Sequence, residues 1–312
     1  MPIIHLSDFT EKDTLPQGTV LILGYFDGVH KGHRALITEA ASIAAGLGGR
    51  ETCVWTFDSM PKAHAKSLTT TEEKCRLFAE CGVDYVILED FESLKSLGGR
   101  DFFTRCIADK FAPAAVVCGF NFTFGNGASC TAEDLCKMAE SRNILCSVVE
   151  EQSENGEVIS SSRIRRLIES GRVKDANLLI ESPYSITSVI EHGVQIGRKM
   201  GVRTINQRLP KEKVQPKNGV YCCSVTFEEN GKENIYGGVC NIGHRPTVND
   251  NQSDVTIETH IFDFDGEIYG KCATVKLYEM LREEKKFADI DSLRSAIEQD
   301  VTRAKELLKN IL

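Results

Sequence analysis

The hydrophobic pattern of the chain changes its period once, near residue 183, and this change constrains the fold more than any other feature. Up to about residue 181, short apolar runs alternate with stretches of helical periodicity. Short buried strands that alternate with helices indicate a parallel sheet covered on both faces, so we predict an α/β domain. Ligands of such sheets bind beyond the carboxyl ends of the strands. The predicted strands span residues 19–23, 52–57, 85–88, 114–118 and 145–149, and the predicted helices span 34–45, 72–80, 101–110, 132–141, 162–169 and 173–180.

From Tyr184 onward the pattern takes a period of two, which is typical of half-buried antiparallel strands. We predict two antiparallel hairpins, and together they favour a small antiparallel β-barrel. An amphipathic helix then ends the chain. Because Pro183 separates the two patterns, we expect two domains, 1–182 and 183–312. The hairpins pair residues 221–227 with 236–240 and residues 254–262 with 273–278, and the final helix spans 292–309.

The composition argues against several classes of protein. A net charge of −8 does not suit a protein that binds nucleic acid backbones, because such proteins need a basic face. The apolar runs are far shorter than a membrane span and the first residues show no signal-peptide pattern, so we expect a cytoplasmic protein. None of the 12 cysteines forms a C-x-x-C pair, so we expect buried, reduced thiols rather than zinc ligands. Apolar neighbours predict burial for Cys53, Cys118, Cys146, Cys222 and Cys240.

The segment 24–33, which reads GYFDGVHKGH, lies between the first predicted strand and the first predicted helix. Helix N-termini favour anions because their first N–H groups are unpaired. Two imidazoles there could bind the phosphates of ATP and neutralise charge that develops at the attacked phosphorus, whereas the alternative is a pair of surface histidines. The candidate catalytic residues are His30 and His33, and the candidate nucleotide-binding residues are Gly24, Phe26, Asp27, Gly28 and Gly32.

A second polar segment begins the predicted helix 162–169. Ser160, Ser161 and Ser162 can cap this helix, and Arg165 could bind a triphosphate with two hydrogen bonds. The alternative is an ordinary capped helix with exposed arginines. We regard the three serines as candidate nucleotide-binding residues and Arg165 as a candidate catalytic residue.

Together the two segments resemble the nucleotidyltransferase superfamily, and GYFDGVHKGH resembles the adenylyltransferase half of bacterial riboflavin kinase/FAD synthetases. The stretches TFD at 56–58, LTTTEEK at 68–74 and GFNFTFGNG at 119–127 are similar to the same family. The resemblance implies a Rossmann-like domain that transfers AMP from ATP to the phosphate of FMN, with Asn121 in the nucleotide pocket. The chain departs from the family where Met60 replaces a histidine and where Asn121 and Thr123 replace Asp and Arg.

Residues 184–312 resemble the riboflavin kinases. The resemblance implies that the loop with Gly193, Gly197 and Gly201 binds the nucleotide phosphates, as backbone amides of glycine-rich loops do. It also implies that Thr204 and Asn206 hold Mg²⁺, although this chain reads Val-Arg-Thr-Ile-Asn where the family has Phe-Pro-Thr-Ala-Asn.

The same resemblance implies that Glu258 is the general base that accepts the proton of the riboflavin hydroxyl. A glutamate on a polar strand face is otherwise most often only solvated. The implied flavin-binding residues are Asn241, Arg245, Arg282, Glu284 and Phe287.

We therefore expect a bifunctional transferase that makes FMN from riboflavin and FAD from FMN in two separate sites, with ATP as substrate and Mg²⁺ as cofactor. Its partners would be riboflavin, FMN, FAD and ATP, with neither nucleic acid nor membrane, and weak self-association is left open. Two alternatives are a protein that retains only one of the two activities and a flavin- or nucleotide-binding protein without turnover. A carrier would have no use for a histidine pair or a general base.

Overall fold

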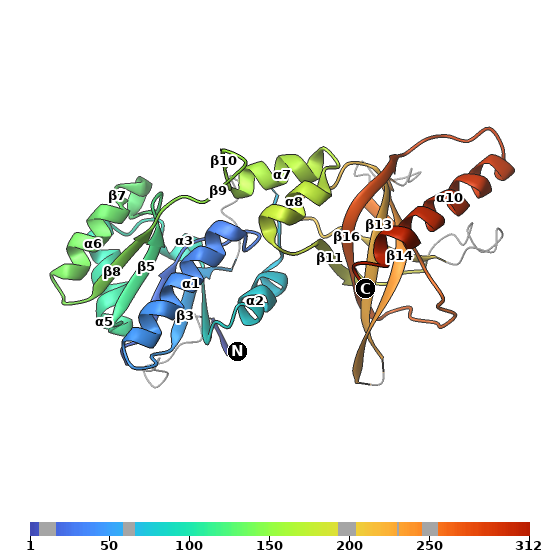
Figure 1. Cartoon of the computed structure of the whole chain (residues 1–312). Helices are drawn as coiled ribbons and strands as arrows, with labels where there is room; N and C mark the ends of the chain where they lie inside the picture. Colours follow the sequence, from blue (N-terminus) through green and yellow to red (C-terminus); the bar gives the residue numbers. More distant parts are fainter. Residues whose placement is uncertain (6–16, 59–65, 193–203, 230, 245–254) are drawn as a thin grey trace. The chain divides into compact units, whose positions relative to one another are not determined.

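The computed structural model describes residues 1–5, 17–58, 66–192, 204–229, 231–244 and 255–312 (Figure 1). These residues form two compact units, Met1–Ser161 and Ser162–Leu312. Among the described residues, no helix combines the length and the apolar character that a membrane span requires.

The first unit contains a six-stranded parallel sheet in the order β1-β4-β3-β2-β5-β8. The chain places β3 and β4 on one side of β2 and places β5 and β8 on the other side, so the strand order reverses between β2 and β5. All five predicted strands are confirmed, with bounds that differ by at most one residue, whereas β1 was not predicted. The strands are β1 (Ile3–His5), β2 (Val20–Leu23), β3 (Thr52–Phe57), β4 (Tyr85–Glu89), β5 (Ala115–Gly119) and β8 (Leu145–Val149).

Alternate residues of β2 point into two apolar layers, one on each face of the sheet. Val20 and Ile22 pack with α1 (Lys31–Gly46) and α2 (Thr71–Glu80). Leu21 and Leu23 pack with α6 (Ala132–Glu140) and with the segment 102–111. This arrangement confirms the prediction of a sheet covered on both faces.

Two details of these helices bear on the sequence predictions. Thr70 is the N-cap of α2 and forms a capping box with Glu73, which begins the predicted helix 72–80. The predicted helix 101–110 is instead a π-helix, η2 (Phe102–Ala108), between the short α4 (Gly99–Asp101) and α5 (Asp109–Phe111). A hydrophobic period shows that a segment is helical, but it does not distinguish an i→i+4 from an i→i+5 hydrogen-bond pattern.

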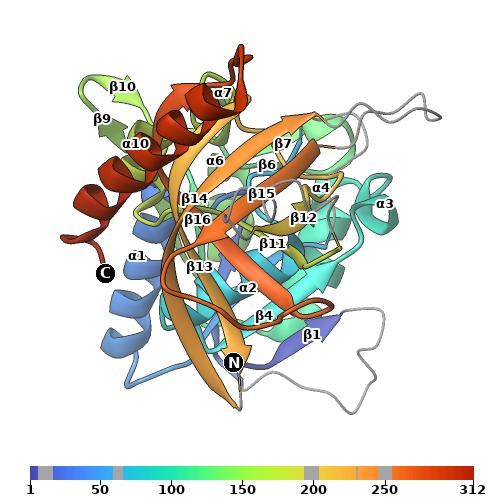
Figure 2. The ribbon, with the colours of Figure 1, turned by 90° about the vertical axis from the view of Figure 1, so that its right-hand side faces the viewer.

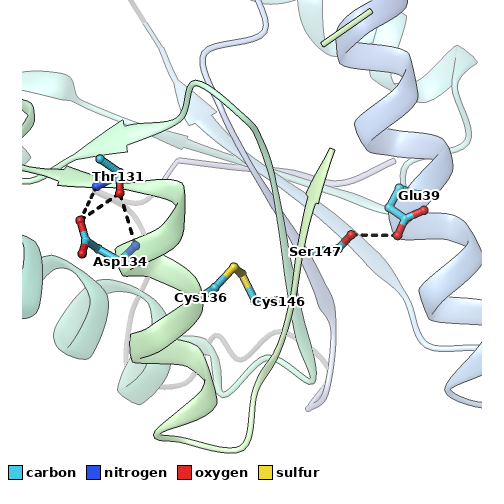
Figure 3. Close-up of a disulfide and its surroundings, with 6 residues drawn as sticks. All are labelled: Glu39, Thr131, Asp134, Cys136, Cys146 and Ser147. Carbon is cyan, nitrogen blue, oxygen red and sulfur yellow. Dashed lines mark hydrogen bonds between the residues drawn. A yellow bond between two sulfur atoms is a disulfide. The ribbon is translucent and has the colours of Figure 1, made fainter. Parts of the chain in front are cut away.

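One cysteine prediction is wrong. Cys146, at the start of the edge strand β8, forms a disulfide with Cys136 of α6, with an S–S distance of 2.10 Å and a Cα–Cα distance of 5.2 Å (Figure 3). On the same strand Ser147 donates a hydrogen bond of 2.8 Å to Glu39 of α1. The pairing depends on the packing of α6 against β8, which a separation of ten residues does not reveal. The other four named cysteines, Cys53, Cys118, Cys222 and Cys240, are free and buried as predicted.

The second unit contains a six-stranded antiparallel sheet in the order β11-β16-β13-β14-β15-β12. Its first and last strands meet, because the N–H of Glu191 donates to the carbonyl of Asn206 at 2.7 Å and the Gln207 amide donates to the carbonyl of Ser188 at 2.8 Å. The sheet therefore closes into the predicted barrel. Its strands are β11 (Tyr184–Val189), β12 (Ile205–Arg208), β13 (Gly219–Glu229), β14 (Lys232–His244), β15 (Val255–Ile261) and β16 (Cys272–Glu283).

The first predicted hairpin is confirmed as β13 and β14, which pair from Glu229↔Lys232 to Gly219↔Ile242. The second predicted hairpin is wrong, because β15 lies between β14 and β12 whereas β16 lies between β13 and β11 (Figure 2). A period of two shows which residues of a strand face the core. It does not show which strand lies beside it.

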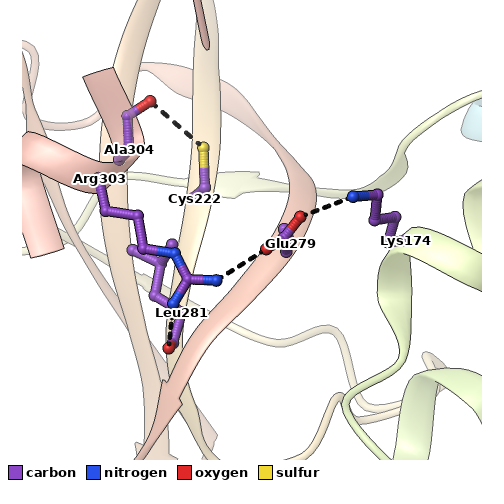
Figure 4. A network of polar contacts seen from close by, with 6 residues as sticks. All are labelled: Lys174, Cys222, Glu279, Leu281, Arg303 and Ala304. Atoms are coloured by element: carbon purple, nitrogen blue, oxygen red, sulfur yellow. Dashed lines mark hydrogen bonds and ion pairs between the residues drawn. The ribbon is translucent and has the colours of Figure 1, made fainter. Parts of the chain in front are cut away.

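Two helices of the second unit pack against the described strands of the barrel. The last helix, α10 (Ile290–Leu308), places Ala304 and Leu308 on the outward-facing Val220 and Cys222. Glu279 of β16 accepts hydrogen bonds from Lys174 at 3.0 Å and from Arg303 of α10 at 2.9 Å (Figure 4). Lys174 lies on α8 (Val173–Ile180), which follows α7 (Ser161–Glu169). Because most of α7 and all of α8 belong to the second unit, the domain boundary after residue 182 stays a prediction.

Candidate active sites

The loop between β2 and α1 lies where the strand order of the parallel sheet reverses, at the carboxyl end of β2. Three residues of this loop have a left-handed backbone: Phe26 (φ 59°), Gly28 (φ 84°) and Val29 (φ 40°). A positive φ is unusual for phenylalanine and rarer still for a β-branched valine. Such strain persists only where the surroundings fix the loop, and it clusters at functional sites.

Asp27 connects this loop to the LTTTEEK segment. Its buried carboxylate accepts hydrogen bonds from the N–H of Leu68 at 2.8 Å and of Thr69 at 3.4 Å. The N–H of Gly28 donates to the Thr69 hydroxyl at 3.3 Å. Asp27 therefore holds two chain segments together, and a ligand-binding role for its side chain stays a prediction.

The serine segment reaches the same loop. The Ser161 hydroxyl donates to the carbonyl oxygen of Asp27 at 3.0 Å. Ser160 is half-buried and Ser162 is exposed. Arg165 follows on α7, half-buried, and belongs to the second compact unit. The structure thus brings Ser161 to the first motif, whereas the roles of Ser160 and Ser162 stay predictions.

His30 is the N-cap of α1, and its ring stacks on His33 with a centroid distance of 3.7 Å and an interplanar angle of 17°. Burial lowers the pKa of His30 to about 4. Burial, with the charges of His30 and Lys74, also holds the pKa of His33 well below its usual range. Both Nδ1 atoms are buried without a hydrogen-bond partner in the described part of the chain. Both imidazoles are therefore neutral near pH 7 and have a nitrogen left for a ligand.

The glycines and the phenylalanine of the loop make room for these rings. A Cβ on Gly32 would lie 3.1 Å from Cε1 of His30, and a Cβ on Gly24 would lie 2.9 Å from the Phe26 ring. Phe26 is fully buried, and its ring centroid lies 5.1 Å from that of His33 and 5.4 Å from that of Phe78. The Phe26 side chain therefore supports His33 from the core, and only its backbone remains for a nucleotide.

Asn121 follows β5, the neighbour of β2 across the reversal of strand order, and is exposed. The N–H of Phe122 donates to the carbonyl of Gly119 at 3.0 Å, which folds a tight turn around Asn121. The N–H of Phe120 donates to Val149 of β8 at 2.9 Å, which anchors this turn to the sheet. The two motifs therefore lie at the carboxyl ends of adjacent strands, where ligands of such sheets bind.

Sequence reasoning missed one residue of this region. Lys74 of α2 is buried, and its ammonium donates to the carbonyl of Phe57 at 2.6 Å and to the Thr56 hydroxyl at 3.4 Å. Burial lowers its pKa to about 8. The only signal was the resemblance of LTTTEEK to the family, because lysines are almost never fully buried and helical periodicity does not identify the exception.

In the barrel, three predicted residues lie side by side. Asn206 of β12 pairs directly with Glu258 of β15, and Glu258 pairs on its other side with Asn241 of β14. Directly paired residues of antiparallel strands project from the same face. The row continues through Val220 to Arg282 of β16, and because Val220 packs on α10 the row lies on the outer face of the barrel.

The predicted flavin-side residues lie near the end of this row. Arg282 forms two hydrogen bonds with the mostly buried Asp300 of α10, at 3.0 Å and 2.9 Å, and its guanidinium carbon lies 5.4 Å from the centre of the Phe287 ring. A Cβ on Gly243 would lie 2.8 Å from the Glu284 carboxylate, so Glu284 covers the strand that carries Asn241. Arg282 thus has a structural partner, and its role toward flavin stays a prediction.

Several predicted residues lie outside the described residues. They are Gly193, Gly197, Gly201 and Arg245, together with Met60 and Arg203, at which the chain departs from the family. Thr204 is described and half-buried, two residues before Asn206.

The predicted Mg²⁺ site can be compared with the oxygen atoms that the described residues offer. Among the described residues, no group of three or more His, Cys, Asp or Glu side chains could hold a metal ion. Oδ1 of Asn206, however, is buried without a hydrogen-bond partner in that part of the chain. Amide, hydroxyl and carboxylate oxygens suit Mg²⁺, which keeps several waters and binds through substrate phosphates. The hydroxyl of Thr204 and the amide oxygen of Asn206 therefore fit the group.

Comparisons with known proteins cover both units. A riboflavin kinase family model matches residues 180–308, and an FAD synthetase family model matches residues 12–163. The chain is 35% identical over 292 residues to the bifunctional riboflavin kinase/FMN adenylyltransferase of Listeria monocytogenes, covering 90% of each chain. It is 32% identical over 298 residues to that of Escherichia coli K12, covering 93% of each.

A solved structure is similar over nearly the whole chain. The crystal structure of a macrolide-efflux protein from Streptococcus pneumoniae has a TM-score of 0.85 and 28% sequence identity, and the match covers 97% of this chain and 98% of that chain. Each unit therefore has a fold similar to one that has been determined experimentally.

Proposed function

The chain belongs to the family of bifunctional riboflavin kinases/FMN adenylyltransferases, and we propose that its two reactions take place in separate sites, one in each compact unit. The protein is a transferase of FAD biosynthesis: it phosphorylates riboflavin with ATP to give FMN, and it adenylylates FMN with ATP to give FAD. The first unit carries the adenylyltransferase site and the second unit carries the kinase site.

For the adenylyltransferase, the stacked pair His30 and His33 carries the proposal. A phosphate oxygen of FMN attacks the α-phosphorus of ATP, and pyrophosphate leaves. The phosphate is already an anionic nucleophile, so the protein must align the two substrates and stabilise the transition state. Because both imidazoles are held neutral, each can donate one N–H to a phosphate oxygen but neither offsets its charge. The strained loop, fixed by Asp27 and Ser161, holds both rings ready for this contact.

For the kinase, the row Asn206–Glu258–Asn241 carries the proposal. The terminal hydroxyl of riboflavin attacks the γ-phosphorus of ATP, and Glu258 accepts the hydroxyl proton as ADP leaves. The paired Asn206 and Asn241 confine the carboxylate from both sides. Thr204 and Asn206 would hold Mg²⁺, which would offset the negative charge of the ATP phosphates.

Glu258→Gln tests the assignment of the base and of the separate sites together. The substitution keeps the shape and removes proton acceptance, so FMN formation from riboflavin is expected to fall roughly 100-fold or more. FAD formation from added FMN should stay at the wild-type rate, and chromatographic separation of the flavins measures both. The matched control is Glu228→Gln, an exposed carboxylate of β13 in the same barrel. Wild-type FMN formation by Glu258→Gln would remove the base assignment, and loss of both activities would contradict separate sites.

The location and the assembly of the protein also belong to the proposal. Substrates such as ATP and FMN favour the cytoplasm, where the acidic net charge of −8 is ordinary. The Cys136–Cys146 disulfide is more typical of oxidising compartments. Weak self-association stays a prediction that size-exclusion chromatography over a range of concentrations would test.

A further inference from the structure

The neutral histidine pair does not offset the negative charge that the substrates bring to the adenylyltransferase site. The substrates bring the triphosphate of ATP and the phosphate of FMN to the same loop. His30 and His33 can donate hydrogen bonds, but burial keeps both uncharged near pH 7. A lysine or arginine side chain beside the loop would add positive charge for these anions.

Lys74 places a positive charge beside the start of the GYFDGVHKGH loop. Its ammonium donates to the carbonyl of Phe57 at 2.6 Å, at the carboxyl end of β3, the neighbour of β2. It also donates to the Thr56 hydroxyl at 3.4 Å, and that hydroxyl donates to the carbonyl of Tyr25 at 2.9 Å. The ammonium lies 5.2 Å from the centre of the Tyr25 ring. Lys74 is thus connected to the second residue of the GYFDGVHKGH loop through its backbone and its ring.

The groups that face Lys74 make its charge available near neutral pH. Burial lowers its pKa to about 8, while Cys75 of its own helix, Asp27 of the loop and Asp58 after β3 favour the protonated form. The Lys74 charge in turn lowers the pKa of His33 on α1. Burying a charge is costly, and a methionine would fill a similar space without that cost. The hydrogen bonds to Phe57 and Thr56 offset this cost, and they hold the charge of Lys74 beside the loop.

We propose that Lys74 is a positioning residue of the adenylyltransferase: its buried ammonium fixes the loop that carries His30 and His33, and its charge attracts the phosphates of ATP to that loop. The inference rests on the proposed role of the two histidines. It gives a role to Lys74, the lysine of the LTTTEEK segment, which takes no part in the proposed mechanism of the two histidines.

The first test is Lys74→Met, with FMN and ATP as substrates. The KM for ATP in FAD formation is expected to rise roughly tenfold or more, since a nearby charge is removed from a mostly desolvated site. The riboflavin kinase rate of the same protein sample should not change. The matched control is Lys213→Met in the barrel, because Lys213 is also buried, donates to the carbonyl of Ser185 at 2.7 Å and lies 4.8 Å from the Tyr184 ring centre. FAD formation by this control should keep the wild-type KM for ATP.

The second test is the pH dependence, which a structural role would not alter. In the wild type, the KM for ATP should rise between pH 7 and pH 9 as Lys74 loses its proton near pH 8. His33 is neutral throughout this range, because burial holds its pKa well below the ordinary value. Lys74→Arg keeps its charge in this range, so its KM for ATP should not change with pH, even if Lys74→Met fails to fold.

A failure of the role of Lys74 and a failure of the proposed histidine site give different results. If Lys74→Met retained the wild-type KM, or if Lys74→Arg retained the wild-type pH dependence, the role of Lys74 would be refuted. A His33→Asn variant measured alongside should lose FAD formation while it still makes FMN. If His33→Asn made FAD at the wild-type rate, the assignment of the site itself would be wrong.

Discussion

Acid should destabilise the first unit through its buried histidines, and His30 allows the effect to be worked out. Its pKa is about 4 in the folded protein against an ordinary value of 6.5, and its exposed fraction is 6%. Below pH 6.5 the unfolded chain therefore binds a proton that the folded protein does not bind. The stability that the neutral ring contributes is complete above pH 6.5 and is lost as the pH falls toward 4.

The size of this loss follows from the two pKa values. The full difference corresponds to about 3 kcal/mol at about 1.36 kcal/mol per pKa unit. Between pH 7 and pH 5, His30 alone should lower the free energy of unfolding of the first unit by about 2 kcal/mol. His33 adds a loss of the same sign, because its pKa is lowered as well.

The assay uses Trp55, which is the only tryptophan of the chain and is buried on β3 of the first unit. Its fluorescence during urea unfolding reports on this unit, since the second unit has no tryptophan. His30→Gln keeps a polar side chain that does not titrate. The wild type should lose about 2 kcal/mol more than His30→Gln between pH 7 and pH 5. Equal losses in the two proteins would show that the His30 ring is not held neutral.

Two further substitutions test the loop and the barrel. Gly28→Ala should destabilise the first unit by about 1–3 kcal/mol and slow FAD formation, because φ at this position is 84° and the new Cβ would lie 2.7 Å from Leu68. If urea unfolding followed by Trp55 fluorescence were the same as in the wild type, this prediction would be contradicted. Asp300→Asn leaves the Arg282 guanidinium without its carboxylate, so the second unit should lose roughly 3 kcal/mol and FMN formation should slow. Thermal unfolding by circular dichroism measures the loss, and an unchanged melting temperature would show that the pair contributes little.

Much of the first unit could be predicted because its strands are continuous apolar runs. β2 is buried at all four positions, and such runs stand out from the amphipathic helices that follow them. β12 could not be predicted, since it reads Ile-Asn-Gln-Arg and its Gln207 points into the barrel. The Gln207 amide is accommodated by the carbonyls of Ser188 and Ala273, each at 2.8 Å. A buried polar residue with partners far away in the chain does not have a sequence pattern.

The sites show the same division between local and distant information. The loop from Gly24 to His33 is contiguous, so a single string of residues could identify it. Its supports at Lys74 and Ser161 come from segments tens of residues away and appear only in the fold. In the barrel, the wrong pairing of the second hairpin did not enter the prediction for Glu258, because that prediction came from the resemblance of residues 184–312 to the riboflavin kinases. Only the register shows that Asn206 and Asn241 flank it.

The register also bears on one departure from the family. Where the family has alanine between the threonine and the asparagine, this chain has the much larger Ile205. Ile205 pairs with Thr259, which is fully buried, and is itself only 8% exposed, whereas Asn206 pairs with Glu258 on the opposite face. Successive residues of a strand point to opposite faces, so the extra volume of isoleucine enters the barrel interior and not the kinase site. The substitution therefore changes the packing beneath the site while the proposed ligands keep their positions, and it should alter stability more than the phosphorylation of riboflavin.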